Sequence, residues 1–214
     1  MFTLYTFGDS ILDCGVYNPR GLTPGGLIVK NADAIFPEFA GRDLTARGPA
    51  RLTHRARDGA VVADLLAQAR GLSAPDGPAA ALVTVGGNDL LAGLASERQD
   101  GPRFAALAGA LDAFLDALPV RPVLLGNVYD PTFGDDVRDF LGISPEVSRA
   151  NLARVNERIA AAARRLGPGR GALVDIHAHF LTGDPSWLVK VIEPSLVGAS
   201  EVRRAFWHEM ASID

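Results

Sequence analysis

Residues 2–10 read FTLYTFGDS, and this stretch decides the fold that we expect for the chain. A short apolar, β-prone run is typical of a strand buried on both faces of a parallel sheet. Gly-Asp-Ser follows at the carboxyl end of the strand, where an α/β sheet presents side chains to a ligand crevice. Ser10 is therefore either a nucleophile or the N-cap of a following helix, because serine hydroxyls serve both purposes.

Three more apolar runs of this kind alternate with segments that have helical spacing. The runs are AALVTV before Gly86, PVLLGNVY from Pro122 and GALVDI before His177. The helical segments are VVADLLAQARG, RFAALAGALDAFLDAL and EVSRANLARVNERIAAAARRLG, the last beginning after Ser144 and Pro145 and ending at Gly167. Alternating strands and helices imply right-handed crossovers, so we predict a three-layer α/β/α sandwich with about five parallel strands.

Two further regions complete this prediction. Residues 13–57 are rich in Gly, Pro and Arg, and we expect a second strand near RLTHRA plus a surface excursion over the site. The stretch GASEVRRAFWHEM predicts an amphipathic C-terminal helix with solvated Arg203 and Arg204. Its sheet-facing residues are predicted to be Val202, Ala205, Phe206 and Met210.

Composition narrows the classes of protein that the chain can belong to. With 214 residues, 48% of them hydrophobic, it can bury one substantial core, and we predict a single domain over residues 1–214. A net charge of -4 with dispersed basic residues argues against a nucleic-acid partner. Cys14 is the only cysteine, which excludes an internal disulfide, and we expect its small side chain to be buried in the core. We expect no membrane span and a cytoplasmic location, because no long apolar run or basic leader is evident.

Polar or glycine-rich blocks follow the first three predicted strands. They are GDS, then Asp58-Gly59, then GGND at residues 86–89. The carboxyl ends of parallel strands meet on one edge, so these blocks should converge. A hydroxyl nucleophile surrounded by N–H donors is what acyl transfer requires, because the carbonyl oxygen becomes negative in the tetrahedral intermediate.

FGDSxLD joined to VTVGGNDL resembles the GDSL, or SGNH, hydrolases, a family of esterases, lipases, thioesterases and deacetylases on a flavodoxin-like sandwich. The resemblance implies that Ser10 is the nucleophile. It places the backbone N–H of Ser10, that of Gly59 and the side chain of Asn88 in the oxyanion hole. It also implies a small or medium ester or acyl substrate and no cofactor. Structural roles compete with these: Gly59 can end a strand, and Asn88 with Asp89 can cap a helix.

The sequence departs from the family's last block, which reads Asp-x-x-His-Pro and then Gly after a short gap. Here the chain reads KVIEPSLVG. Aligning Pro194 and Gly198 puts Glu193 where the family has its histidine base and Lys190 where it has aspartate. Both standard partners of the nucleophile are therefore replaced.

Three explanations remain open for the missing histidine. Glu193 acts as the base, provided that burial raises its pKa, because an ordinary carboxylate is a weak base toward serine. Alternatively His177 or His179 in DIHAHF supplies the base, with His54 a weaker candidate and His208 expected on the surface or at a cap. In the third, the chain is a catalytically weak or inactive ligand-binding protein.

Two other features near the end of the chain have structural and functional interpretations. The HxH of DIHAHF can bind metal, but no third ligand is evident apart from Asp175 or Asp184, so we predict no metal site. Trp187 either packs in the core or lies over the substrate.

Overall fold

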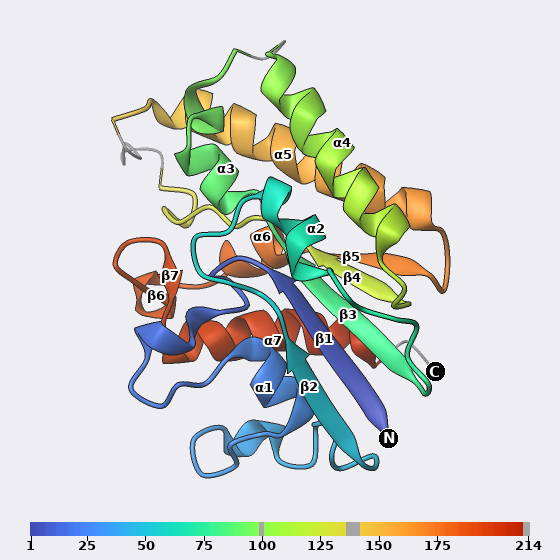
Figure 1. Ribbon diagram of the computed structural model, residues 1–214. Coiled ribbons are helices and arrows are strands. Elements are labelled where there is room, and N and C mark those ends of the chain that lie inside the picture. Colours follow the sequence, from blue (N-terminus) through green and yellow to red (C-terminus); the bar gives the residue numbers. More distant parts are fainter. Residues whose placement is uncertain (99–100, 136–141, 212–214) are drawn as a thin grey trace.

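A five-stranded parallel sheet organises the computed structural model, which describes residues 1–98, 101–135 and 142–211 (Figure 1). The strands lie in the order β2-β1-β3-β4-β5, the flavodoxin-like order expected from the resemblance. Their bounds are β1 Phe2–Gly8, β2 Ala50–His54, β3 Ala79–Thr84, β4 Val123–Gly126 and β5 Gly171–Val174. A separate antiparallel hairpin pairs β6, Leu188–Val189, with β7, Glu193–Pro194.

Helices cover both faces of the sheet and complete the predicted three-layer sandwich (Figure 1). On one face lie α2 (Leu65–Gln68), α4 (Pro102–Ala117) and α5 (Pro145–Leu166). On the other lie α1 (Pro24–Val29), α6 (Ile176–Phe180) and α7 (Leu196–Met210). The remaining helical elements are α3 (Gly87–Leu91) and the 3-10 turns η1 (Cys14–Tyr17), η2 (Pro37–Phe39), η3 (Val62–Asp64), η4 (Leu94–Ser96) and η5 (Pro185–Trp187). None of the helices in the described ranges is apolar over the length that a bilayer requires.

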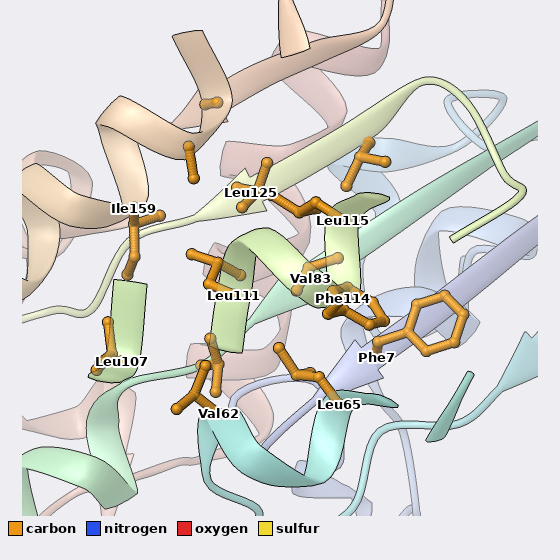
Figure 2. Close-up of a cluster of buried hydrophobic side chains, with 14 of the residues drawn as sticks. Phe7, Val62, Leu65, Val83, Leu107, Leu111, Phe114, Leu115, Leu125 and Ile159 are labelled. Atoms are coloured by element: carbon orange, nitrogen blue, oxygen red, sulfur yellow. The ribbon is translucent and has the colours of Figure 1, made fainter. Parts of the chain in front are cut away.

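Alternating side chains of the strands supply two hydrophobic cores. Phe7 and Val83 point to the face of α2, α4 and α5, where Phe114 and Leu111 are also fully buried (Figure 2). Leu4, Leu82 and Leu124 point to the opposite face and pack with Val202 and Phe206 of α7. Successive side chains of a strand point to opposite faces of the sheet, and helices cover both faces here. This explains why the strands read as continuous apolar runs.

Most of the predicted helices and strands are present, but several differ in length from the prediction. The strand near RLTHRA is β2, and α5 begins after Ser144, whose hydroxyl accepts a hydrogen bond from Val147 N at 3.4 Å. The helix predicted over VVADLLAQARG is much shorter and consists of η3 and α2. Cys14 is fully buried, as predicted.

The prediction of a solvated Arg203 is wrong. Its side chain is fully buried against the excursion, where its guanidinium carbon lies 3.4 Å from the centroid of the Phe39 ring. Nη1 donates to Asn31 Oδ1 at 2.7 Å, and Nη2 donates to Ser200 Oγ. Burial lowers the pKa of Arg203 to about 10. The Phe39 ring and these hydrogen-bond acceptors replace water around the Arg203 guanidinium, so the excursion within residues 13–57 is held against α7.

Candidate active site

Ser10 lies in a tight turn directly after β1 and is 8% exposed. The turn is closed by Leu12 N and Asp13 N, which donate to Asp9 O at 3.2 and 3.1 Å. The first helical element afterwards is η1, with Asp13 at its N-cap position, so Ser10 caps no helix. The capping interpretation of Ser10 is therefore wrong.

Gly8 shows why the motif before Ser10 begins with glycine. Its φ is +113°, and a Cβ there would meet the carbonyl oxygen of Thr84 at 1.6 Å. A larger residue would push β1 and β3 apart at their carboxyl ends. Gln68 of α2 binds both backbone groups of Gly8. Gly8 N donates to Gln68 Oε1 at 2.7 Å, and Gln68 Nε2 donates to Gly8 O at 2.9 Å. Sequence reasoning missed Gln68, because its bonds go to backbone and follow no motif.

Asp9 is a buried carboxyl beside the candidate nucleophile, and only 1% of its surface is exposed. Its Oδ1 accepts hydrogen bonds from Thr84 Oγ1 at 2.8 Å and from Ile11 N at 3.2 Å. Burial raises the pKa of Asp9 to about 6 despite these bonds, and the charge of Glu193 adds to the increase. The protein therefore places two carboxyl groups, Asp9 and Glu193, near Ser10.

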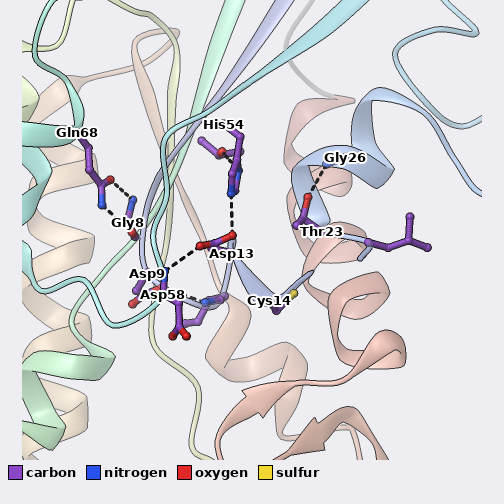
Figure 3. Close-up of polar contacts among 12 residues, drawn as sticks. Gly8, Asp9, Asp13, Cys14, Thr23, Gly26, His54, Asp58 and Gln68 are labelled. Atoms are coloured by element: carbon purple, nitrogen blue, oxygen red, sulfur yellow. Dashed lines mark hydrogen bonds and ion pairs between the residues drawn. The ribbon is translucent and has the colours of Figure 1, made fainter. Parts of the chain in front are cut away.

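The Asp58-Gly59 turn is held against η1 by a polar network (Figure 3). Asp58 N donates to Asp13 Oδ2 at 2.9 Å, and Tyr17 Oη donates to Asp58 Oδ2 at 2.5 Å. Asp13 Oδ1 lies 3.0 Å from His54 Nε2. The φ of Gly59 is +78°, a conformation that favours glycine, and the residue is exposed. This network fixes the backbone at Gly59, and its member Tyr17 carried no sequence signal.

Asn88 lies in the short helix α3, beside the same turn. Its Nδ2 donates to Ala60 O at 3.0 Å, which ties α3 to the residue after Gly59. Gly86, not Asn88, takes the N-cap position of α3, and Asp89 Oδ2 instead accepts from Val62 N at 3.1 Å. The capping interpretation of Asn88 and Asp89 is thus wrong. Asn88 and Ser10 line one pocket.

Glu193 in β7 lies close enough to Ser10 for its carboxylate to interact with the serine side chain, and this interaction lowers the Glu193 pKa. Glu193 is 9% exposed, and burial raises its pKa above 4.5. The interaction with Ser10 and the positive charge of Lys190 lower the pKa, and neither cancels the effect of burial. Within the described residues, Glu193 Oε2 is buried and accepts no well-formed hydrogen bond. A buried, poorly satisfied carboxylate facing a hydroxyl is an arrangement for taking its proton.

Two of the histidines considered as alternative bases, His179 and His54, have side-chain partners elsewhere. His179 Nε2 lies 2.9 Å from Glu201 Oε2 on α7, and His54 Nδ1 lies 2.7 Å from Thr6 Oγ1. His177 is in α6, where its backbone N donates to Asn127 Oδ1 at 2.8 Å, and its side-chain Nδ1 is buried without a hydrogen-bond partner among the described residues. His208 lies in the last turn of α7. Glu193 is the carboxylate that interacts with Ser10.

A mostly apolar pocket opens beside Ser10. Its apolar lining comes chiefly from α3, η4, α5 and the segment after β4: Ile11, Leu90, Leu91, Ala95, Val128, Leu152 and Ile192. Asp130 and Arg149 also line it and are paired at 2.9 Å.

Trp187 does not lie beside this pocket: it is partly buried on the opposite face of the sheet, with its ring centroid 5.2 Å from that of Phe180. In the described ranges, no three metal-ligating side chains come together.

Solved structures with this fold include several esterases and a lipase. Axe2, an acetylxylan esterase from Geobacillus stearothermophilus, is 20% identical, with a TM-score of 0.66, covering 97% of this chain and 93% of that one. The lipase Lip_vut3 from a goat rumen metagenome is 17% identical, with a TM-score of 0.67 and 96% of both chains covered. A member of the lipolytic G-D-S-L family from Veillonella parvula is 16% identical, with a TM-score of 0.66 and 99% of both chains covered.

Among curated proteins, none matches the chain significantly. The family comparison is more informative, because it compares the sequence itself. The model of the GDSL-like lipase/acylhydrolase family matches residues 6–195, a range that includes Ser10, Gly59, Asn88 and Glu193. The chain belongs to the GDSL-like lipase/acylhydrolase family.

Proposed function

We propose that this protein hydrolyses carboxylic esters through an acyl-enzyme on Ser10, with Glu193 as the general base in place of the family's histidine. The contact between the Glu193 carboxylate and the Ser10 hydroxyl carries the proposal. The family supports ester hydrolysis as the class of reaction. Two structures of Axe2 are described as catalytic mutants in which a serine or a histidine is replaced by alanine.

The reaction proceeds in two halves on this arrangement. Ser10 Oγ attacks the ester carbonyl carbon while its proton passes to Glu193. The backbone N–H groups of Ser10 and Gly59 and the amide of Asn88 donate to the carbonyl oxygen as it becomes negative. The carbon–oxygen bond to the alcohol then breaks, and the alcohol leaves with the proton from Glu193. Water, deprotonated by Glu193, releases the acid and restores Ser10.

A raised pKa makes the substitution of glutamate for histidine chemically reasonable. A general base works best when its pKa is near the operating pH, and a carboxylate at its ordinary value is too weak. Burial of Glu193 moves its pKa toward that range, and Lys190, in the family's aspartate position, opposes the shift. An enzyme built this way works at lower pH than a histidine enzyme can, because its base stays ionised there.

The apolar pocket indicates an acyl group larger than acetyl. Side chains such as Leu91 and Leu152 line it and would leave an acetyl group with few contacts. Next to Gly59, a polar groove lined by residues including Arg55 and Arg57 is open to the alcohol part of the substrate. We therefore propose a short- or medium-chain acyl ester of a polar alcohol.

The first experiment measures hydrolysis of p-nitrophenyl butyrate and labelling by a fluorophosphonate. We expect Ser10→Ala to abolish both, while the matched variant Ser96→Ala, at an exposed serine outside the pocket, keeps them. Turnover or labelling that survives in Ser10→Ala would remove Ser10 as the nucleophile. A wild type that neither turns over any ester nor reacts with the probe would favour a ligand-binding protein.

The second experiment tests the base through pH. Glu193 must be ionised to accept a proton, so kcat/KM should fall as the pH drops through its pKa, with a midpoint above the ordinary 4.5. Glu193→Gln should remove most activity, and Glu157→Gln, at an exposed glutamate of α5, should leave the profile unchanged. Full activity in Glu193→Gln, with loss in His177→Ala or His179→Ala, would transfer the role to histidine.

A further inference from the structure

We propose that Tyr129 is a positioning residue for Glu193: its hydroxyl holds the carbonyl of Ile192 and keeps the β6–β7 hairpin in the conformation that presents Glu193 to Ser10. This inference rests on the proposed function, in which Glu193 is the base. Tyr129 lies outside the blocks that define the family resemblance.

The hairpin that carries Glu193 is poorly suited to hold itself in place. Its two strands have two residues each, paired as Leu188 with Pro194 and Val189 with Glu193. A short two-stranded ribbon is marginal without other support. The turn between the strands contains Lys190 at φ +48° and Val191 at φ +76°, and 71% of Val191 is exposed. Left-handed backbone is unfavourable for a β-branched residue, so this turn persists only where its surroundings hold it.

Tyr129 supplies a contact from the main body of the protein. It follows β4, is 5% exposed and stacks on Phe180 of α6 with ring centroids 4.3 Å apart. Its hydroxyl donates to Ile192 O, one peptide before Glu193. Burial, together with the charges of Glu193 and Asp9, raises the pKa of Tyr129 well above 10. The hydroxyl therefore remains a donor throughout the pH range of catalysis.

The two ends of the hairpin are joined to each other at its base. Ser195 N donates to Trp187 O at 2.9 Å, and Ser195 Oγ donates to Ser186 O at 2.7 Å. These bonds fix the base of the hairpin, whereas the Tyr129 bond lies between the strained turn and Glu193. Loss of the Tyr129 bond should therefore leave the base of the hairpin closed but let the Glu193 carboxylate move away from Ser10.

The experiment compares Tyr129→Phe with Glu193→Gln and with the double variant, using p-nitrophenyl butyrate. Phenylalanine keeps the stacked ring and removes the hydroxyl. We expect kcat to fall about tenfold with KM nearly unchanged, because one buried carbonyl loses its donor next to the base. The acid limb should move to lower pH, since a displaced Glu193 is better solvated. Tyr5→Phe, at a tyrosine buried in the opposite core, is the control.

The double variant separates this inference from the proposed function. If Tyr129 acts through Glu193, adding Tyr129→Phe to Glu193→Gln should cost no further activity. An equal tenfold loss in both backgrounds, or an unchanged kcat in Tyr129→Phe, would overturn the role of Tyr129 and leave the base in place. Full activity in Glu193→Gln alone would overturn the base and, with it, this inference. The rate of fluorophosphonate labelling gives the same comparison without turnover.

Discussion

Replacing Asp9 by asparagine should change how the stability of the protein depends on pH. The pKa of Asp9 is about 6 in the folded protein against an ordinary 3.8. A carboxyl whose pKa is raised by folding stabilises the protein most below the unfolded value, and this contribution is lost as the pH rises through the folded value. The difference is about two pKa units, so ionisation of Asp9 costs about 3 kcal/mol of folding free energy above pH 7.

Asparagine preserves the geometry while removing the titration. Its side-chain oxygen can accept the bonds that Asp9 receives from Thr84 Oγ1 and Ile11 N. Any constant change in stability from the substitution therefore cancels when one variant is compared at two pH values. Between pH 4 and pH 7, the stability of Asp9→Asn relative to wild type should improve by about 2 to 3 kcal/mol.

Urea unfolding at several pH values measures this difference. Asp130→Asn is the control, because Asp130 is also buried but has a lowered pKa: bonds from Thr132 and Arg149 outweigh the effect of its burial. Its stability contribution is lost only as the pH falls below about 4, so its difference from wild type should be nearly flat from pH 4 to 7. If the stability difference between Asp9→Asn and wild type also stays constant from pH 4 to 7, burial does not raise the pKa of Asp9 and the reasoning is refuted.

Three further substitutions test other parts of the structure. Asn88→Ala should lower kcat by about a hundredfold to a thousandfold if its amide serves the oxyanion, and an unchanged kcat for p-nitrophenyl butyrate would exclude that role. Leu91→Trp should narrow the apolar pocket and shift preference in a series of p-nitrophenyl esters toward acetate, whereas Leu66→Trp, on exposed α2 surface, should leave the series unchanged. Val191→Asn should stabilise the protein by about 0.5 to 1 kcal/mol in thermal unfolding, because asparagine tolerates the left-handed region. Val16→Asn, at a comparably exposed valine without positive φ, should give no gain.

The sequence predicted the sheet well because apolar runs and helical spacing are local signals. β1, β3, β4, β5 and the long helix α5 all lie where these patterns place them. Residues 13–49 gave no such pattern, and there the structure forms short elements whose positions depend on distant partners. Arg203 was mispredicted for the same reason: its burial depends on Phe39 and Asn31, which are far away in the chain.

For the candidate site, the motif blocks identified Asn88, which lines one pocket with Ser10, but not the residues that hold the backbone of the site in place. Gln68 and Tyr129 donate hydrogen bonds to backbone carbonyls. A donor to a backbone carbonyl can come from many positions in a sequence, so no motif marks these two residues. The location of Glu193 followed from its alignment with the family's histidine. Its burial and its interaction with Ser10 needed the hairpin geometry.

The contact of Arg203 with the excursion has a consequence for biosynthesis. Its partner Asn31 precedes it by 172 residues. During translation, the first strand and the segment beyond it leave the ribosome before α7 is synthesised, so the aromatic rings of that segment lack the Arg203 guanidinium until then. Docking of that segment therefore requires α7, and a ribosome stalled ahead of α7 should display an N-terminal segment that proteases cut readily.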